Sequence, residues 1–208
     1  LYKTLSERGN IDLHVLFLSD AGAIAYHDPG FNRTLSWDIP LLEGYQYRIL
    51  EPGFPLEESG FWLRHSSKLK QALDTLNPDF IQIYGYASRM NWMARRWAIR
   101  HKKKIIYFSD SNIYNSRSTL KNLAKHIVVS RFFKNVNQFL STSEANEKYL
   151  KYFGAKENCI ARIPFAIEYH RWSSLENSLS TRRRYHFAWA GKLTTRKRPF
   201  DFINALRI

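Results

Sequence analysis

The sequence has few of the residues that disulfide-linked or metal-dependent proteins require. It holds a single cysteine, Cys159, so no disulfide can form within the chain and a reducing compartment is expected. Its seven histidines show no metal-ligand spacing, so neither a metal nor any other cofactor is expected. No stretch approaches the roughly 18 apolar residues that a membrane-spanning helix needs.

Three glycine motifs are absent as well. Without G-x-G-x-x-G or G-x-x-x-x-G-K-[ST], the sequence supports neither a dinucleotide-binding fingerprint nor a P-loop NTPase. Without G-x-S-x-G, a serine hydrolase has no nucleophile position. These absences leave charge and the order of secondary structure as the informative features.

Acidic residues are scarce relative to basic ones. The 208 residues include 18 Asp and Glu against 32 Lys and Arg, which gives a formal net charge of +14. Such a charge indicates anionic partners, namely nucleotide phosphates, nucleic acid or an acidic lipid surface, or else a solvated basic surface. The 15% aromatic content argues against disorder.

Apolar runs of strand length alternate with segments of helical period. This alternation predicts a doubly wound, mostly parallel α/β sheet of the Rossmann-like kind. The expected strands are 11–18, 80–84, 105–108, 139–140 and 160–163. The expected helices are 56–76, 88–100, 119–134 and 143–154.

A long irregular connection is expected at 23–56, with a short strand at 45–50. It is rich in aromatic residues, including Tyr26, Trp37 and Tyr45. Ordered connections of this length are usually functional. These side chains either stack on sugars or bases, or pack the connection onto its own domain.

Ligands of such sheets bind beyond the carboxyl ends of the strands, which directs attention to the loops after Leu18, Tyr84, Phe108 and Leu140. Asp110 follows one of these strands and could orient or deprotonate a hydroxyl group. It could equally form an Asx-turn or cap a helix. The remaining candidates for one wall of a cleft are Tyr84, Gly85, Arg89 and Ser111.

The C-terminal stretch has the order of a phosphate-binding unit. Residues 187–190 predict a buried strand, Gly191 ends it, and basic residues lead to a helix that begins at Pro199. A basic loop followed by a helix N-terminus offers cations and backbone N–H groups to a phosphate. The polar segment 168–184 is interpreted as a linker.

Several segments together resemble the GT-B glycosyltransferases of family 4. They are 37–45 (WDIPLLEGY), 78–85 (PDFIQIYG), 136–146 (VNQFLSTSEAN) with Tyr149-Leu150 and Phe153-Gly154, 163–168 (IPFAIE) and 189–199 (WAGKLTTRKRP). The resemblance implies two Rossmann-like domains that face a cleft. Residues 1–172 would form the N-terminal acceptor-binding domain, with its first strand expected upstream. Residues 173–184 would be the linker, and 185–208 the start of the donor domain.

The resemblance also implies a reaction. A sugar would pass from a UDP- or GDP-sugar to a glycan or lipid-linked acceptor, with retention of configuration and without a metal. Lys192 and Lys197 fall where the family holds the donor diphosphate, and Arg198 would contribute. The first of these positions is often Arg in the family, so Lys192 exchanges a bidentate contact for a point charge. Asp110 would be the catalytic residue of the acceptor domain, and the residues that bind the acceptor would be Tyr84, Gly85, Arg89 and Ser111.

The expected setting is the cytoplasm, with the basic helices 88–104 and 119–134 facing an anionic membrane and a product at the cell surface. The chain is expected to be inactive without the rest of the donor domain. Two alternatives remain open. One is a basic nucleic-acid-binding module, against which stands the scatter of its basic residues over several elements. The other is a non-catalytic scaffold of the same fold.

Overall fold

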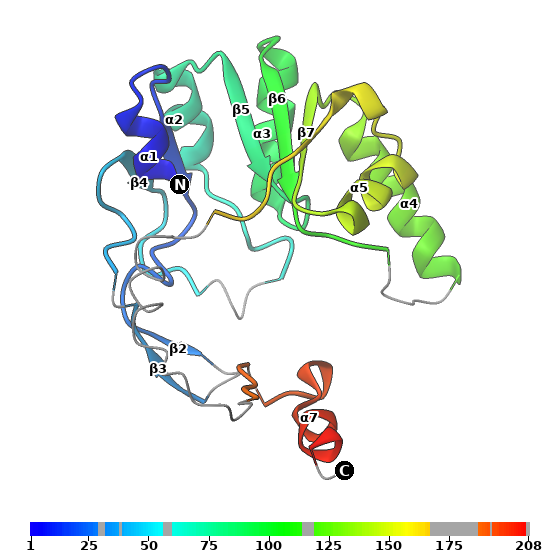
Figure 1. The fold of residues 1–208 in the computed structure, drawn as a ribbon. Helices are drawn as coiled ribbons and strands as arrows, with labels where there is room; N and C mark the ends of the chain where they lie inside the picture. The colour runs from blue at the N-terminus through cyan, green and yellow to red at the C-terminus, as the bar shows by residue number, and fades with distance from the viewer. Residues whose placement is uncertain are drawn as a thin grey trace.

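A four-stranded parallel sheet forms the centre of the molecule in the computed structural model (Figure 1). The structure describes residues 1–28, 32–37, 39–55, 60–113, 119–166, 187–191 and 193–206. The strands of the sheet are β5 (Phe80–Tyr84), β6 (Lys104–Ser109), β7 (Gln138–Ser141) and β8 (Ile160–Arg162). They lie in chain order and all run in parallel. The predicted α/β fold with a parallel sheet is therefore confirmed.

Helices connect and cover these strands. They are α2 (Lys68–Leu76), α3 (Arg89–Arg100), α4 (Thr119–Phe133) and α5 (Glu144–Tyr152). Serine caps begin two of these helices, because the Ser88 and Ser143 hydroxyls each accept a hydrogen bond at 3.2 Å from a backbone N–H of the first turn. At the end of α2, Asn77 adopts the left-handed conformation and precedes Pro78, which stops the helix.

The predicted start of the helix at 56–76 is wrong. Within its described part, residues 60–66 form turns, and α2 begins only at Lys68. A partner elsewhere in the chain explains this: the Ser66 hydroxyl donates a hydrogen bond to Glu51 at 2.6 Å and accepts one from the Lys68 N–H at 3.1 Å. These bonds hold Ser66 outside the helix. Positions 56–59 lie outside the described residues.

The hydrophobic core is dominated by aromatic rings between the sheet and its helices. Tyr107 of β6 contacts Phe132 and Phe133 of α4, and its ring centroid lies 4.8 Å from that of Phe133. Phe139 of β7 lies 4.9 Å from Phe133, in an edge-to-face arrangement. Such pairs contribute about 0.5–1.5 kcal/mol beyond their area burial. The packing holds the strands' carboxyl ends in a fixed relation to one another.

The N-terminal region adds two small sheets. After α1 (Tyr2–Glu7), β1 (His14–Phe17) pairs in parallel with β4 (Gln46–Ile49), which confirms the short strand predicted at 45–50. The connection between them contains a hairpin of β2 (Tyr26–Asp28) and β3 (Arg33–Leu35), so the prediction of a wholly irregular segment is wrong. The hairpin escaped prediction because neither strand exceeds three residues.

The C-terminal segment differs from the prediction in one element. Residues 187–190 form no strand, because no described segment pairs with them. A 3₁₀ turn, η3 (Thr195–Lys197), and α7 (Pro199–Ala205) follow, and Pro199 takes the first helical position as expected. Among the described helices of the whole chain, none is both long enough and apolar enough to cross a bilayer.

Candidate functional site

The carboxyl ends of β5, β6, β7 and β8 meet at one edge of the sheet. The backbone N–H of Gly85 donates to the Phe108 carbonyl at 2.8 Å, and that of Ile163 donates to the Ser141 carbonyl at 2.7 Å. The rings of Tyr84 and Phe108 pack with centroids 5.3 Å apart. We call this edge, with the loops that follow the strands, the carboxyl edge.

Tyr84 and Asp110, two of the predicted site residues, are neighbours at the carboxyl edge. Partial burial raises the pKa of the Tyr84 hydroxyl, and the negative charge of Asp110 raises it further. The Asp110 carboxylate is exposed and accepts no hydrogen bond from any residue that the structure describes. Within that part of the chain it therefore does not act as an Asx-turn or a cap, and it is open to a ligand.

Asn146 holds the loop that carries Asp110 and Ser111. Its side chain, in the first turn of α5, is only 1% exposed. The Asn146 amide donates to the Ser111 carbonyl at 2.6 Å, and its oxygen accepts from the Thr142 N–H at 3.3 Å. One bond uses the NH₂ group of the amide and the other uses its oxygen. A side chain at this position must therefore supply both a donor and an acceptor, as asparagine does. Sequence reasoning assigned Asn146 no site role, although it stands in the segment 136–146.

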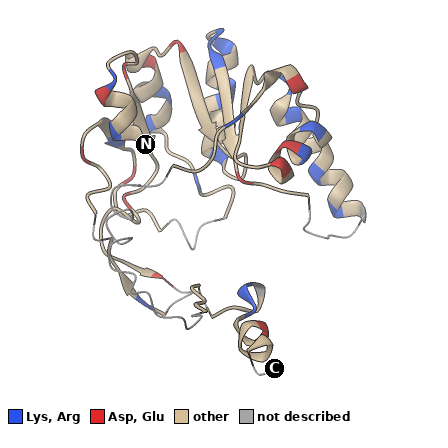
Figure 2. Ribbon diagram, in the orientation of Figure 1, with Lys and Arg blue, Asp and Glu red and all other residues tan. Residues whose placement is uncertain are grey.

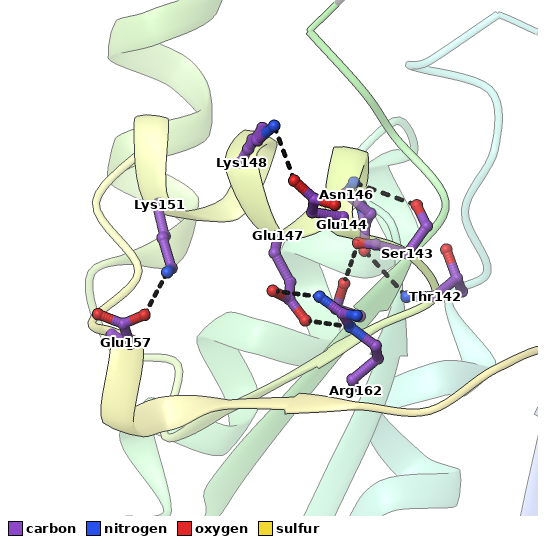
Figure 3. Close-up of polar contacts among 10 residues, drawn as sticks. Thr142, Ser143, Glu144, Asn146, Glu147, Lys148, Lys151, Glu157 and Arg162 are labelled. Carbon is purple, nitrogen blue, oxygen red and sulfur yellow. Dashed lines mark hydrogen bonds and ion pairs between the residues drawn. The ribbon is translucent and has the colours of Figure 1, made fainter.

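An ion pair fixes β8 against α5 behind this loop. Arg162 contacts Glu147 through two atoms, with Nε–Oε1 at 2.6 Å and Nη2–Oε2 at 2.9 Å (Figure 3). The hydrogen bonds from Arg162 hold the pKa of the Glu147 carboxyl below its ordinary value. The pair lies at the end of the last strand and sets the direction of the chain that leaves it.

A cavity of about 430 Å³ lies beyond the carboxyl ends of β1 and β4. Most of its lining is apolar or aromatic, and we call it the Trp37 pocket. Trp37 remains 61% exposed, whereas the Tyr45 ring packs 5.3 Å from the Tyr2 ring and its hydroxyl donates to the Leu41 carbonyl. The lining consists of Tyr2, Phe17, Ser19, Asp20, Ala21, Gly22, Ala23, Trp37, Ile39, Leu41, Leu42, Tyr45 and Ile49.

Two polar side chains in the lining of the Trp37 pocket, Ser19 and Asp20, connect the loops that form it. Asp20 accepts from the Gly53 N–H at 2.8 Å, and the Ser19 hydroxyl donates to the Phe54 carbonyl at 2.8 Å. Both bonds join the loop after β1 to the loop after β4. Asp20 is therefore committed to structure, whereas the exposed face of Trp37 is available to a ligand. The loop after Leu18 was a predicted ligand position, and Trp37 and Tyr45 were among the aromatics predicted either to stack on a ligand or to pack; the other pocket residues were not identified from the sequence.

The Trp37 pocket adjoins the carboxyl edge. After burial and the Asp110 charge, the third cause of the raised pKa of Tyr84 is its electrostatic interaction with Tyr2, which lines the pocket. An electrostatic effect of this kind weakens with distance. A ligand that contacts Tyr2 would therefore lie on the side of the pocket toward Tyr84.

The other predicted acceptor residues occupy lesser positions. Gly85 has a φ of +73°, which explains the glycine, and its carbonyl accepts from the Asn91 amide at 3.1 Å. Arg89 begins α3 with its backbone N–H donating to the Phe61 carbonyl at 3.1 Å, and it is exposed. The structure thus brings Tyr84, Gly85, Asp110 and Ser111 to one edge, with Arg89 at the helix start nearby.

Of the predicted phosphate residues, the two that the structure describes, Lys197 and Arg198, are not brought to this edge. Lys192 lies outside the described residues, and Figure 1 shows α7 well separated from the carboxyl edge. Lys197 is exposed, and its side chain lies near Gly191. Arg198 is paired with Asp201, with Nε–Oδ2 at 2.5 Å. Among the described residues, no three His, Cys, Asp or Glu side chains are grouped as a metal ion would require.

Comparison with known proteins adds no assignment. No protein-family model, no curated protein and no solved structure matches the chain. Function is therefore inferred from the residues and their arrangement.

Proposed function

We propose that this chain is the acceptor-binding part of a glycosyltransferase that takes its sugar from a nucleotide-sugar. The observation that carries the proposal is the open Trp37 pocket beside the exposed Asp110 carboxylate. The C–H face of a sugar ring packs well on an aromatic ring, and the Trp37 ring is exposed for such contact. The exposed Asp110 carboxylate, at the end of β6, can receive the proton of an acceptor hydroxyl.

In this proposal Asp110 orients the acceptor hydroxyl and takes its proton, or stabilises the charge that develops there. Tyr84, Gly85, Arg89 and Ser111 shape the acceptor side around it. Tyr84 keeps its proton at neutral pH, because burial and the Asp110 charge both raise its pKa. It therefore serves as a hydrogen-bond donor to the acceptor and not as a base.

The donor diphosphate would be held by Lys192, Lys197 and Arg198. Negative charge grows on the diphosphate as the sugar leaves, so fixed cations stabilise the transition state more than the ground state. Lys197 is the stronger candidate of the two described residues, since the charge of Arg198 is already shared with Asp201. The donor is a UDP- or GDP-sugar, the acceptor a glycan or lipid-linked saccharide, and the setting the cytoplasm. Transfer retains configuration and uses no metal.

We further propose the doubly wound form of the fold and the GT-B arrangement of domains, with residues 1–172, 173–184 and 185–208 as its parts. The sheet β5-β6-β7-β8 extends in one direction from β5, and in Figure 1 β4, α1 and α2 lie on the opposite side of β5. A chain that winds away from a central strand in both directions creates a crevice there, where ligands bind in open α/β sheets. The Trp37 pocket at the ends of β1 and β4 supports this arrangement.

The test is a transfer assay with the protein that carries this chain, using a panel of radiolabelled UDP- and GDP-sugars and a saccharide acceptor. Asp110→Asn should lower kcat by about 10²–10⁴, the usual contribution of a positioned acid or base. Asp79→Asn is the matched control, because Asp79 is an exposed aspartate at the amino end of the same sheet. Absence of transfer from every donor, or equal effects of the two substitutions, would contradict the proposal.

A further inference from the structure

Helix α4 is apolar on both of its faces. Val129, Phe132 and Phe133 face the core and are buried. On the opposite side, Leu120, Leu123 and Ile127 are 81%, 59% and 60% exposed, and Val128 is exposed beside them. A surface helix normally turns charged and polar residues outward, and one that is apolar all round is normally covered on all sides. We call the residues Leu120, Leu123, Ile127 and Val128 the α4 outer face.

The charge around the α4 outer face has one sign. Residues 119–134 contain no Asp or Glu, and Figure 2 shows basic residues at intervals along α4. They include Lys121 and Arg131, and Lys134 follows directly. The Lys125 ammonium instead packs over the rings of Tyr149 and Phe153, at 4.9 and 5.4 Å. The nearest glutamates of α5, Glu144 and Glu147, are paired with Lys148 and Arg162. Both carboxylates are therefore already engaged by cations outside α4.

The neighbouring helices lack this combination. The only large apolar residue exposed on α3 is Ile99, and the only one exposed on α5 is Tyr152. The exposed lysines of α5, Lys148 and Lys151, contact Glu144 and Glu157. Within the described helices of this region, α4 is thus the one that combines an exposed apolar surface of several residues with basic residues and no acidic residue of its own.

A cavity of about 380 Å³ between α4 and α5 adjoins the α4 outer face. His126, Ser130 and Lys134 line it from α4 at intervals of four residues, which places them on one ridge of the helix. The Nδ1 atom of His126 is buried and has no hydrogen-bond partner among the described residues. A phosphate in this cavity would meet a lysine ammonium, a hydroxyl and an imidazole, while its attached chains could lie along Leu123 and Ile127.

We propose that the α4 outer face docks on an anionic membrane surface, with a lipid phosphate in the α4–α5 cavity. Basic residues around an apolar helical face are the composition of helices that lie in the membrane interface. With 15 residues, α4 is about 22 Å long, too short for the roughly 30 Å hydrocarbon core, so it lies on the bilayer. The sequence had suggested two basic helices for this role, and the geometry favours α4 alone.

This inference does not depend on the proposed transfer reaction. Membrane docking can be measured without a sugar donor or an acceptor, and a failed transfer assay would leave it standing. If both hold, the docked enzyme would meet a lipid-linked acceptor at the bilayer surface.

The test is co-sedimentation of the chain with vesicles at low salt, using pure phosphatidylcholine and a mixture of phosphatidylcholine with phosphatidylglycerol. The chain should bind only the anionic vesicles, with affinity that falls as salt rises. Leu123→Ser combined with Ile127→Ser should weaken binding at least about tenfold, because the apolar contact is lost. Lys134→Gln should weaken it about fivefold, the effect expected for one cation near an anionic surface.

Matched controls keep the test specific. Ile99→Ser replaces an exposed aliphatic residue of α3, and Lys156→Gln replaces an exposed lysine after α5. Both should leave vesicle binding within about twofold of the unaltered chain. Circular dichroism would verify that each variant keeps its helical content. The proposal is overturned by equal binding to neutral vesicles, by no binding, by equal loss in the controls, or by a dimer in solution that the double substitution dissociates.

Discussion

Residues 60–166 and residues 1–55 build their structure in different ways. The first set, which we call the four-strand region, contributes every buried apolar residue of the described core except Leu50. The second, which we call the pocket region, pairs short strands and exposes Trp37 and Tyr47. Its cohesion comes from bonds such as Asp20 to Gly53. Stability is therefore concentrated in one region, and the capacity to bind a ligand in the other.

The difference also explains where the proposed catalytic group stands. Asp110 follows β6, the strand whose neighbours on both sides are hydrogen-bonded to it, so its backbone is held firmly. Trp37 belongs to the looser region and can adjust to a ligand. A rigid reactive group beside an adaptable binding surface suits an enzyme that positions a large acceptor.

The largest expected effect is on the core of the four-strand region. Phe132→Ala removes a fully buried ring that contacts Tyr107 and Trp92, and should lower the free energy of unfolding by about 3–5 kcal/mol. Phe80→Ala, at an exposed aromatic position in the same region, should cost far less. Denaturant unfolding monitored by circular dichroism measures both. Similar losses would contradict the concentration of stability in the core.

A smaller effect is expected at Asn146, which is buried in the four-strand region and also holds the loop of the proposed catalytic residue. Asn146→Ala leaves the Ser111 carbonyl and the Thr142 N–H without their partner, which should cost about 1–3 kcal/mol and loosen the Asp110 loop. Asn146→Asp keeps the acceptor for Thr142 but loses the donor to Ser111. If the donor matters for the loop, both variants should reduce transfer, as measured by the assay with radiolabelled donor. Full activity of Asn146→Asp would show that the Ser111 bond is dispensable.

A still smaller effect, dependent on pH, is expected from Glu147. Its pKa is lowered in the folded chain, so the Arg162 contact stabilises the fold above the ordinary glutamate pKa of about 4.3. This stabilisation is lost as the pH falls through the lowered pKa. Glu147→Gln should therefore be slightly less stable than the unaltered chain at pH 7. The two should converge below about pH 4, as followed by thermal unfolding across pH. A difference that grows toward low pH would contradict the sign.

The two regions also differ in how far the sequence predicts them. The strands β5 to β8 and the helices α3 to α5 lie within one or two residues of their predicted bounds, because apolar runs and the caps at Ser88 and Ser143 act locally. The strands of the β2–β3 hairpin have only three residues each, and the late start of α2 and the missing strand at 187–190 depend on partners elsewhere in the chain. Pairing of that kind leaves no periodic signal in a short segment.

Part of the candidate site was likewise predicted from the sequence, and part of it was not. Asp110, Tyr84 and Ser111 were predicted as candidates because the ends of parallel strands meet at one edge, and the structure places them there. The Trp37 pocket was not predicted, because Tyr2, Trp37 and Tyr45 come from separate segments that only the fold brings together. The aromatic content of the connection was a usable signal, but it did not distinguish Tyr45, which packs, from Trp37, which stays open.

The most direct test of the account is the acceptor dependence of transfer after Trp37→Ala. This substitution should leave the free energy of unfolding within about 0.5 kcal/mol, since the side chain is exposed. The acceptor KM should rise at least about tenfold, as expected when a stacking contact of roughly 1.4 kcal/mol is lost. Phe80→Ala, an exposed aromatic at the amino end of the sheet, should leave the acceptor KM unchanged. An unchanged KM in Trp37→Ala, or an equal rise in both variants, would show that the Trp37 pocket does not bind the acceptor.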